Sequence, residues 1–532
     1  MAHYVLFPAL LLWLSRKSSA NLLNVVLGIG VASFLFSIWA VDATPGAAFY
    51  LLPSRAWELM VGSGLALALL QGRLRPPGKV LREAAGGIGL LFILCAVFTF
   101  DAYTPFPGPA ALLPCVGTGL LIYAGVGGER YVIGRLLGLR ALVFIGLLSY
   151  SLYLWHWPVI VFLKHYLLEP LDVRTMSAAI VASFALAYLS WRFVERPFRK
   201  STGQMFSEGW GWLRIEDTHL FRVTGAVMAL AIAIGLILDQ GDGLPARLHG
   251  EAAAIYAISE DKAPERKRCE GIAPQDVSYE RLCRLVDNEV APSFLVWGDS
   301  HGVAMMHTVG AAAQALQLNG LNATSNGCVP LLDLTRPARD LDATCIGFAQ
   351  RIIDILAQHP QLQTVILISR WARHAEGTAY GEEGKPTLLL RHVDGRQAST
   401  QQENRALFAE GFATTLAKLH ALQRRVVVIG PVPEIGVDVP SIMAKAAMRG
   451  RQLLPGVPRQ AFLQRQAFVL QQMDRSDLSF EYRPVHEYFC DAQNCPAHDG
   501  VLPIYFDDNH PALRGSERLQ PLFAEVLKPA KP

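Results

Sequence analysis

A serine stands where an apolar run ends abruptly before an alanine-rich stretch. Residues 294–297 are typical of a short buried strand, and the chain continues with Gly298-Asp299-Ser300-His301. Residues 303–316 then have helical spacing. A strand-to-helix turn exposes a hydroxyl and directs helix N–H groups toward an oxyanion that develops beside it. Ser300 is therefore a candidate nucleophile, and the alternative is a helix N-cap without chemistry.

The groups that would activate this serine lie far downstream, in a turn at residues 505–511. A weakly acidic hydroxyl needs an adjacent base, and the base needs a partner that fixes its tautomer. The spacing Asp-x-x-His lets one short turn supply both, with Asp507 orienting His510 and with Asp508 as a less favoured partner. A charged surface turn is the alternative for this piece alone. In an α/β segment, the two pieces together favour a catalytic serine.

This pairing resembles the SGNH hydrolase family, which carries Gly-Asp-Ser near the start of the domain and Asp-x-x-His near its end. The resemblance covers about residues 290–525. It implies a nucleophile at Ser300, a base at His510 and a partner at Asp507. It also implies an extracytoplasmic α/β fold of three layers, similar to flavodoxin.

The oxyanion donors of that family are the nucleophile's own N–H, a glycine after the second strand and an asparagine after the third. The glycine corresponds to Gly327. The third-strand stretch, 365–368, continues with Ser369-Arg370-Trp371 and lacks Gly-x-Asn-Asp. We therefore expect Asn326 or main-chain groups to complete the oxyanion hole.

The composition indicates which class of protein contains this domain. The chain has 532 residues, of which 52% are hydrophobic and 17% charged, whereas soluble proteins carry about 25% charged residues. This excludes fibrous, disordered and small disulfide-scaffold proteins and leaves a membrane protein or a membrane part joined to a soluble one. The formal net charge of +3 is too small to suggest nucleic-acid binding.

Apolar runs dominate the chain up to about residue 240. A span needs about 20 apolar residues, which gives about eight candidates. They are residues 4–15, 22–41, 56–71, 84–100, 109–127, 141–163, 176–194 and 222–239. We therefore expect a multi-span α-helical membrane domain at 1–240, a linker leading into the next domain at 241–290, and the SGNH-like domain at 291–532.

Alternate loops between these spans are basic, which sets the direction of the chain because cytoplasmic loops are rich in Lys and Arg. These basic residues are Arg73, Arg75, Lys79, Arg82, Arg130, Arg135, Arg140, Arg192, Arg196, Arg199 and Lys200. The region after residue 240 is then in the periplasm or outside the cell. Eight spans put residue 1 on that side too, so we expect that further spans precede it.

Six of the eight cysteines lie in the exterior region. An even number of cysteines in an oxidising compartment indicates disulfides. The simplest arrangement pairs neighbours: Cys269–Cys283, Cys328–Cys345 and Cys490–Cys495. The last pair alone has metal-like spacing, but no second pair accompanies it, so we expect no metal. Cys95 and Cys115 fall in spans and are read as packing residues.

Three membrane residues are candidates for chemistry because charge at membrane depth is costly unless it is paired or faces a cavity. Arg55 and Glu58 are one helical turn apart; the alternative is an interfacial ion pair that fixes helix depth. His156 lies between two tryptophans; it is either a residue of the aromatic belt or a site that handles protons or substrate. Glu195 and Arg196 are read as capping a helix end.

The stretches that contain these residues, 49–59, 145–158 and 195–198, resemble the membrane acyltransferase-3 family in the branch fused to an SGNH domain. The resemblance implies a multi-pass protein of the cell inner (plasma) membrane with acetyl-CoA as cytoplasmic donor. It also implies that the acyl group crosses the membrane and is transferred to a sugar hydroxyl of lipopolysaccharide O-antigen, peptidoglycan or exopolysaccharide. Residues 3–12 resemble a mid-membrane segment of the family, so His3 does not correspond to its first-span histidine.

Together with the candidate triad, the resemblance implies an O-acetyltransferase in which the membrane half delivers acetyl and Ser300 passes it to a glycan or lipid-linked glycan. One alternative is an extracytoplasmic carbohydrate esterase, with water as the acceptor. The other is a truncated, inactive membrane protein or a transporter, which would not need a serine, an aspartate and a histidine in triad-compatible order. We expect contact with membrane lipid, no bound cofactor and no nucleic acid.

Overall fold

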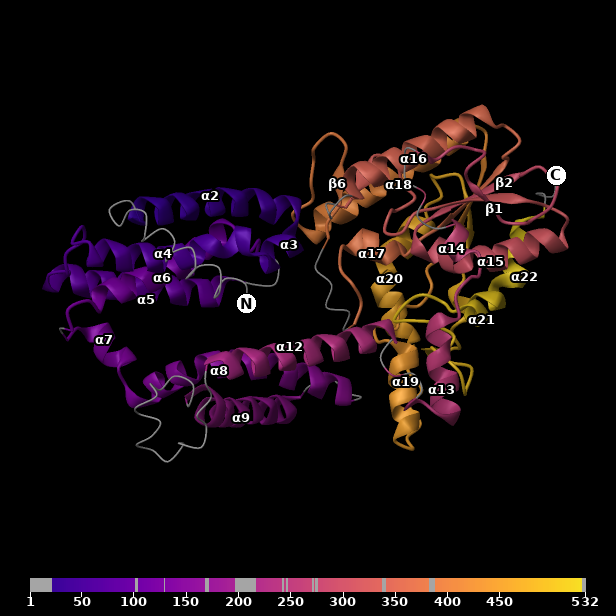
Figure 1. Ribbon diagram of the computed structural model, residues 1–532. Helices are drawn as coiled ribbons and strands as arrows, with labels where there is room; N and C mark the ends of the chain where they lie inside the picture. Colours follow the sequence, from indigo (N-terminus) through magenta and orange to yellow (C-terminus); the bar gives the residue numbers. More distant parts are fainter. Residues whose placement is uncertain are drawn as a thin grey trace. The chain divides into compact units, whose positions relative to one another are not determined.

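The protein divides into two compact units, residues 1–214 and 215–532, in a computed structural model (Figure 1). The structure describes residues 22–100, 104–128, 130–167, 172–196, 217–241, 244, 247–269, 272, 276–336, 341–381 and 388–528. The first expected span, 4–15, lies outside these ranges.

The described part of the first unit is helical. Its helices are α2 (Leu22–Ala43), α3 (Pro45–Tyr50), α4 (Leu52–Leu70), α5 (Lys79–Thr99), α6 (Leu112–Ala124), α7 (Val132–Leu137), α8 (Arg140–Tyr166) and α9 (Val173–Ser190). Within the described residues, four segments are long and apolar enough to cross a membrane: Leu22–Val41, Lys79–Thr99, Arg140–Tyr166 and Val173–Glu195. Pro109–Ala124 and Gly225–Gln240 are apolar but shorter.

These helices pack in pairs, α2 with α4, α5 with α6 and α8 with α9. Small residues allow the close approach, as is common between membrane helices. A Cβ atom added to Gly89 would lie 2.7 Å from the carbonyl oxygen of Gly117. Ser33 links α2 to α4, since its hydroxyl donates to the carbonyl of Pro53 at 2.6 Å and accepts from the N–H of Trp57 at 3.1 Å.

The second unit is built on a six-stranded sheet of order β1-β3-β2-β5-β7-β9. The strands are β1 (Cys283–Arg284), β2 (Phe294–Gly298), β3 (Gly320–Thr324), β5 (Thr364–Ile368), β7 (Arg425–Ile429) and β9 (Glu481–Arg483). All adjacent strands pair in parallel except β1, which runs antiparallel to β3. The carboxyl ends of the parallel strands therefore meet at one edge of the sheet.

Both faces of the central strands β2, β5 and β7 are buried, which explains why these three strands are almost continuously apolar in sequence. Leu295 and Trp297 of β2 belong to one hydrophobic cluster, whereas Phe294 and Val296 belong to another. The first cluster includes residues of α16 (Leu341–Gln358) and α18 (Gln401–Ala421), and the second includes residues of α15 (Ser300–Ala315), α19 (Val439–Met448) and α22 (Gln520–Val526). Figure 1 shows α16 and α18 on one side of the strands and α15 and α22 on the other.

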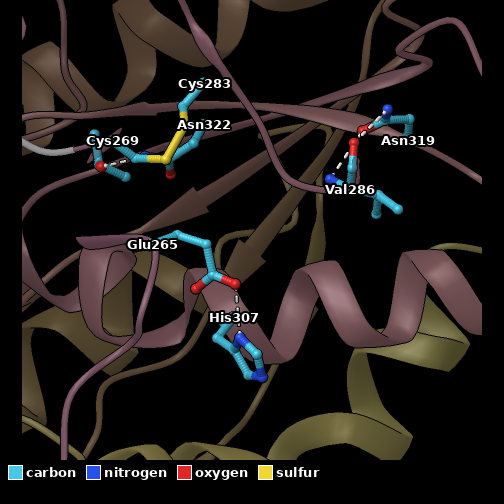
Figure 2. Close-up of a disulfide and its surroundings, with 8 residues drawn as sticks. Glu265, Cys269, Cys283, Val286, His307, Asn319 and Asn322 are labelled. Carbon is cyan, nitrogen blue, oxygen red and sulfur yellow. Dashed lines mark hydrogen bonds and ion pairs between the residues drawn. A yellow bond between two sulfur atoms is a disulfide. The ribbon is translucent and has the colours of Figure 1, made fainter. Parts of the chain in front are cut away.

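The described part of the segment before residue 291, expected to be a linker and entry to the domain at 241–290, packs as part of this folded unit. It contains α13 (Gly250–Ala257), which packs against α19, as well as α14 (Arg266–Cys269) and β1. A disulfide joins Cys269 to Cys283, and Glu265 bonds His307 of α15 at 2.9 Å (Figure 2). The charged residues that make this stretch resemble a linker are interspersed with buried apolar side chains such as Ile255.

The other two disulfides join Cys328 to Cys345 and Cys490 to Cys495. All three are the neighbour pairings expected from the sequence. The pair with metal-like spacing is therefore a disulfide in this structure.

Candidate active site

Ser300 is the first residue of α15 and follows β2 directly. Asp299 caps the helix, its carboxylate accepting the N–H of His301 at 2.9 Å. Gly298 pairs in register with Thr324 of β3 and Ile368 of β5, so the loops after these three strands meet beside the serine. A Cβ atom at residue 298 would lie 2.3 Å from the carbonyl oxygen of Ile368. Only glycine permits this approach.

The structure brings together the three residues singled out from the sequence. His510 Nε2 lies 2.7 Å from Ser300 Oγ, and His510 Nδ1 lies 2.7 Å from Asp507 Oδ2. Because the carboxylate accepts the proton on Nδ1, Nε2 is free to accept the serine proton. This is the arrangement of a nucleophile, a general base and an orienting acid.

Asp507, rather than Asp508, orients the base. Its other oxygen accepts the main-chain N–H groups of Asn509 at 2.9 Å and His510 at 2.7 Å. Burial alone raises the pKa of Asp507, but the hydrogen bond and charge of His510, together with the two N–H groups, outweigh burial and lower the pKa to about 2. The carboxylate is therefore charged throughout the physiological pH range. Asp508 instead accepts the side-chain amide of Asn509 at 2.7 Å.

An aromatic ring supports the base. The ring of Phe506 stacks on that of His510, with centroids 5.2 Å apart and planes 3° from parallel. Two cations from the segment before the sheet lie over the same ring, Lys262 at 5.4 Å and Arg266 at 5.6 Å from its centroid. This segment was not considered a site from sequence, because no motif indicates that it reaches residues so distant in the chain.

The oxyanion candidates lie in the loop after β3, at the same edge of the sheet as Ser300. Gly327 has a left-handed φ of 76°, and its carbonyl accepts a hydrogen bond from Arg336 at 2.8 Å. Asn326 is exposed. The N–H of Ser300 lies at the N-terminus of α15, where helix N–H groups favour negative charge.

The loop after β5 supports the Ser300 turn through Asp299, a role that sequence reasoning missed. Asp299 Oδ2 accepts the hydroxyl of Ser369 at 2.7 Å, the main-chain N–H of Arg370 at 2.9 Å and Nε2 of His374 at 3.0 Å. Burial favours the neutral acid, but the hydrogen bond from His374 and the charges of the neighbouring histidines lower the pKa of Asp299. Burial, followed by the charge of Arg336, lowers the pKa of His374 to about 4.

Whereas the main chain of Arg370 bonds Asp299, its side chain bonds a buried carboxylate. Glu434, in the loop after β7, accepts from Arg370 Nε at 2.5 Å and from Arg465 Nε at 2.8 Å. Only 1% of the Glu434 side chain is exposed. The stretch that departs from the family pattern therefore contacts both Asp299, beside Ser300, and the buried Glu434.

In the first unit, the hydrogen bonds of the three membrane candidates are to residues nearby in sequence. Arg55 forms two hydrogen bonds to Glu58, at 3.1 and 3.0 Å, and lies over the rings of Phe49 and Phe106. His156 Nδ1 lies 2.8 Å from the carbonyl oxygen of Tyr153 in its own helix. None of the hydrogen bonds or ion pairs found among the described residues links His156 to the Arg55–Glu58 pair.

Glu195 has a partner that the sequence did not indicate. Its Oε2 accepts the hydroxyl of Ser151 at 2.9 Å, so a residue expected to cap a helix end also links the α9 segment to α8.

Two family profiles match the sequence. Residues 1–192 match a family described as an acyltransferase domain, and residues 268–525 match one described as an SGNH domain fused to AT3 domains. The second match begins upstream of residue 291, in agreement with the packing of the preceding segment.

Curated relatives match part of the chain. "Peptidoglycan O-acetyltransferase OatA" of Listeria monocytogenes is 30% identical over 280 residues, which are 50% of this chain and 44% of that protein. "Putative peptidoglycan O-acetyltransferase YrhL" of Bacillus subtilis is 31% identical over 253 residues, 45% of this chain and 39% of that protein. The matches span less than half the length of either relative.

A solved structure also matches. It is the periplasmic domain of the Salmonella ser. Paratyphi A lipopolysaccharide acetyltransferase, with a TM-score of 0.36 and 15% identity over 52% of this chain and 100% of that chain.

Proposed function

The chain belongs to the family in which an acyltransferase domain is fused to an SGNH domain, and on that premise we propose that it is an O-acetyltransferase of the cell envelope. The first unit (residues 1–214), here called the membrane unit, takes acetyl from acetyl-CoA at the cytoplasmic face. The second unit (residues 215–532), here called the exterior unit, transfers it to a hydroxyl of a surface glycan. The contact of His510 with both Ser300 and Asp507 carries this proposal, because it is an arrangement for acyl transfer.

The transfer has two steps, acylation of Ser300 and transfer of the acetyl group to the glycan. Ser300 Oγ attacks the acetyl carbonyl while its proton passes to His510 Nε2, and Asp507 stabilises the resulting imidazolium. The group that carried the acetyl to Ser300 leaves with that proton, and acetyl-Ser300 remains. The glycan hydroxyl then attacks the acetyl group as His510 accepts its proton and returns it to Ser300. General-base catalysis contributes about 10²–10⁴-fold to the rate.

The negative charge of the tetrahedral intermediate needs donors. We assign this role to the N–H of Ser300, with Gly327 and Asn326 as the further candidates. One such donor contributes about 10²–10³-fold.

The membrane unit supplies the acyl group in this proposal. Arg55 and Glu58 at the start of α4, and His156 in α8, are its candidate residues for handling the donor. The proposal includes about eight spans in the inner membrane, a periplasmic or exterior second unit, and helices on both faces of the sheet in a three-layer arrangement.

The acceptor class follows from the names of the relatives. Two curated relatives are named as acting on peptidoglycan. We therefore propose a cell-surface glycan with free sugar hydroxyls as the acceptor.

The test is Ser300→Ala in the full-length protein, expressed in cells that lack their own copy. O-acetyl groups released from purified surface glycan by mild base should fall to the level without the protein, while the amount of membrane-inserted protein stays unchanged. Wild-type levels of O-acetyl in that variant would contradict the proposal. An esterase would give the opposite sign, since the active protein would lower glycan O-acetylation and Ser300→Ala would raise it.

A further inference from the structure

A buried hydrogen bond joins the two segments that meet in the active site. His301 follows Ser300 in α15, and Asn509 precedes His510 in the distant turn. His301 Nε2 lies 3.0 Å from Asn509 Oδ1, across 208 residues of sequence, and each residue is 1% exposed. The residues adjacent to the nucleophile and to its base are therefore directly linked.

The chemistry of this bond fixes the tautomer of His301. Asn509 Nδ2 donates to Asp508 Oδ1 at 2.7 Å, so its carbonyl oxygen faces His301 and accepts. His301 Nε2 therefore carries the proton. Among the described residues, its Nδ1 has no hydrogen-bond partner, so a second proton there would be a buried donor without an acceptor.

His301 is consequently neutral when the enzyme works. Burial, and next the charge of His510, lower the pKa of His301 to about 4. Its ring centroid lies only 4.8 Å from that of His510. A neutral ring at this distance lets His510 take up a proton without a second positive charge beside it.

Asn509 also connects the bond to the rest of the catalytic turn. Its N–H donates to Asp507 Oδ1 at 2.9 Å, so one residue contacts the acid that orients the base and the helix that carries the nucleophile. The main chain of the turn is held from a third element, because Ile435 and Gly436 both donate to the carbonyl of Asp508.

We propose that His301 and Asn509 are positioning residues, whose hydrogen bond sets the distance and angle at which His510 meets Ser300. This rests on the proposed function, since it requires Ser300 to be the nucleophile. Neither residue needs to touch the substrate. A displacement of about 1 Å at a reacting group can cost about 10²-fold in rate.

A matched control exists within the same helix. Thr308 Oγ1 and Ser516 Oγ are 2.8 Å apart, are equally buried and are also separated by 208 residues. This bond likewise ties α15 to the C-terminal segment, but two turns away from Ser300. Thr308→Val therefore removes a comparable buried contact without disturbing the neighbours of the triad.

The experiment measures acetyl transfer from 4-nitrophenyl acetate to the full-length protein in detergent, read as nitrophenolate release. The variants are His301→Phe, which keeps an aromatic ring but removes the donor, His301→Gln, which keeps a donor, Asn509→Leu, the double variant His301→Phe/Asn509→Leu, and Thr308→Val. Thermal unfolding of each variant is measured alongside.

We expect His301→Phe and Asn509→Leu each to lower kcat by about 10²-fold, with little change in KM. The double variant should be no slower than the slower single variant, because both remove the same bond. His301→Gln should recover part of the rate, and Thr308→Val should keep kcat at equal loss of thermal stability. If His301→Phe lost no more activity than Thr308→Val, or if the two single effects simply multiplied, the positioning role would be wrong.

Ser300→Ala separates this inference from the function on which it rests. Loss of turnover in Ser300→Ala together with full turnover in His301→Phe would overturn the positioning role alone. Full turnover in Ser300→Ala would overturn the serine mechanism and the positioning role with it. Should His301→Phe fail to fold, two other variants test the same bond. Asn509→Leu removes its acceptor, and His301→Gln replaces its donor conservatively.

Discussion

The candidate nucleophile of the exterior unit meets its base across most of that unit's sequence, whereas the candidate ion pair of the membrane unit lies within one helical turn. His510 meets Ser300 across 210 residues, but Arg55 meets Glu58 across three. Long-range contacts fix geometry only when the whole domain has folded. A local pair forms with its own helix. The difference suggests that the exterior unit depends on tertiary structure for its chemistry, and that the membrane candidates depend mainly on where their helices lie.

The largest expected effect is the loss of the long-range base. His510→Ala should lower acyl transfer from an activated aryl ester by about 10²–10⁴-fold, because Ser300 loses its general base. The measurement is nitrophenolate release by the full-length protein. Lys164→Ala, a charge change in the membrane unit, serves as the control. An unimpaired His510→Ala variant would remove the basis for contrasting the two units.

Removing one carboxylate from each unit, Glu434 here and Glu58 below, tests the comparison through the stability of the protein. Glu434→Gln leaves Arg370 and Arg465 without their buried counter-charge, which should cost about 3–5 kcal/mol of unfolding free energy in the exterior unit. The check is chemical denaturation followed by intrinsic tryptophan fluorescence, to which Trp297 and Trp371, both buried in the core of that unit, contribute. A loss below about 1 kcal/mol, the range of an exposed ion pair, would show that this network is not a structural requirement.

Acid should destabilise the exterior unit in a defined window. The folded-state pKa values of His301 and His374 are lowered from 6.5 to about 4, so their contribution is full above pH 6.5 and is lost as the pH falls toward 4. The pKa of Asp507 is lowered to about 2, so its contribution is lost only below the ordinary carboxyl range. The unfolding temperature should therefore begin to fall near pH 6.5, and His374→Gln should reduce this slope. A temperature that stays constant down to pH 4 would contradict the neutral, buried state of both histidines.

The smallest effect is expected in the membrane unit. The Arg55 and Glu58 side chains are 37% and 18% exposed, and as the interfacial pair described above, in contact with water, they would contribute about 0–1 kcal/mol. Glu58→Gln should therefore change the stability of the detergent-solubilised protein by no more than that. A loss as large as that of Glu434→Gln would show that a local pair can matter as much as a long-range one.

The sequence predicted what is encoded in short motifs. Ser300 and the Asp507–His510 turn were recognised from their spacing, and the parallel strands explain why the loops after β2, β3 and β5 meet beside Ser300. The neighbour disulfides required only the order of the cysteines. The expected span at 56–71 overlaps α4 (Leu52–Leu70), but among the described residues only four helical segments satisfy both length and apolarity.

The sequence did not predict contacts that arise only from packing. Nothing in its local surroundings indicates that His301 bonds Asn509 or that Asp299 collects donors from the loop after β5. The segment at 250–290 resembled a linker because of its charges. Its role depends on Val286, which exchanges two hydrogen bonds with Asn319, and on a disulfide whose second cysteine lies in β1 (Figure 2).

The packing of that early segment determines where a soluble fragment of the exterior unit can be cut. Asp261 accepts the N–H groups of Leu513 and Arg514, close behind the catalytic turn, and Lys262 and Arg266 cover the ring that stacks on His510. A fragment that starts at residue 291 would lose these covers together with both cysteines of one disulfide and the edge strand they brace. A fragment that starts before Gly250 retains all of them. It is therefore the better starting point for crystallisation, isotope labelling and acceptor screening.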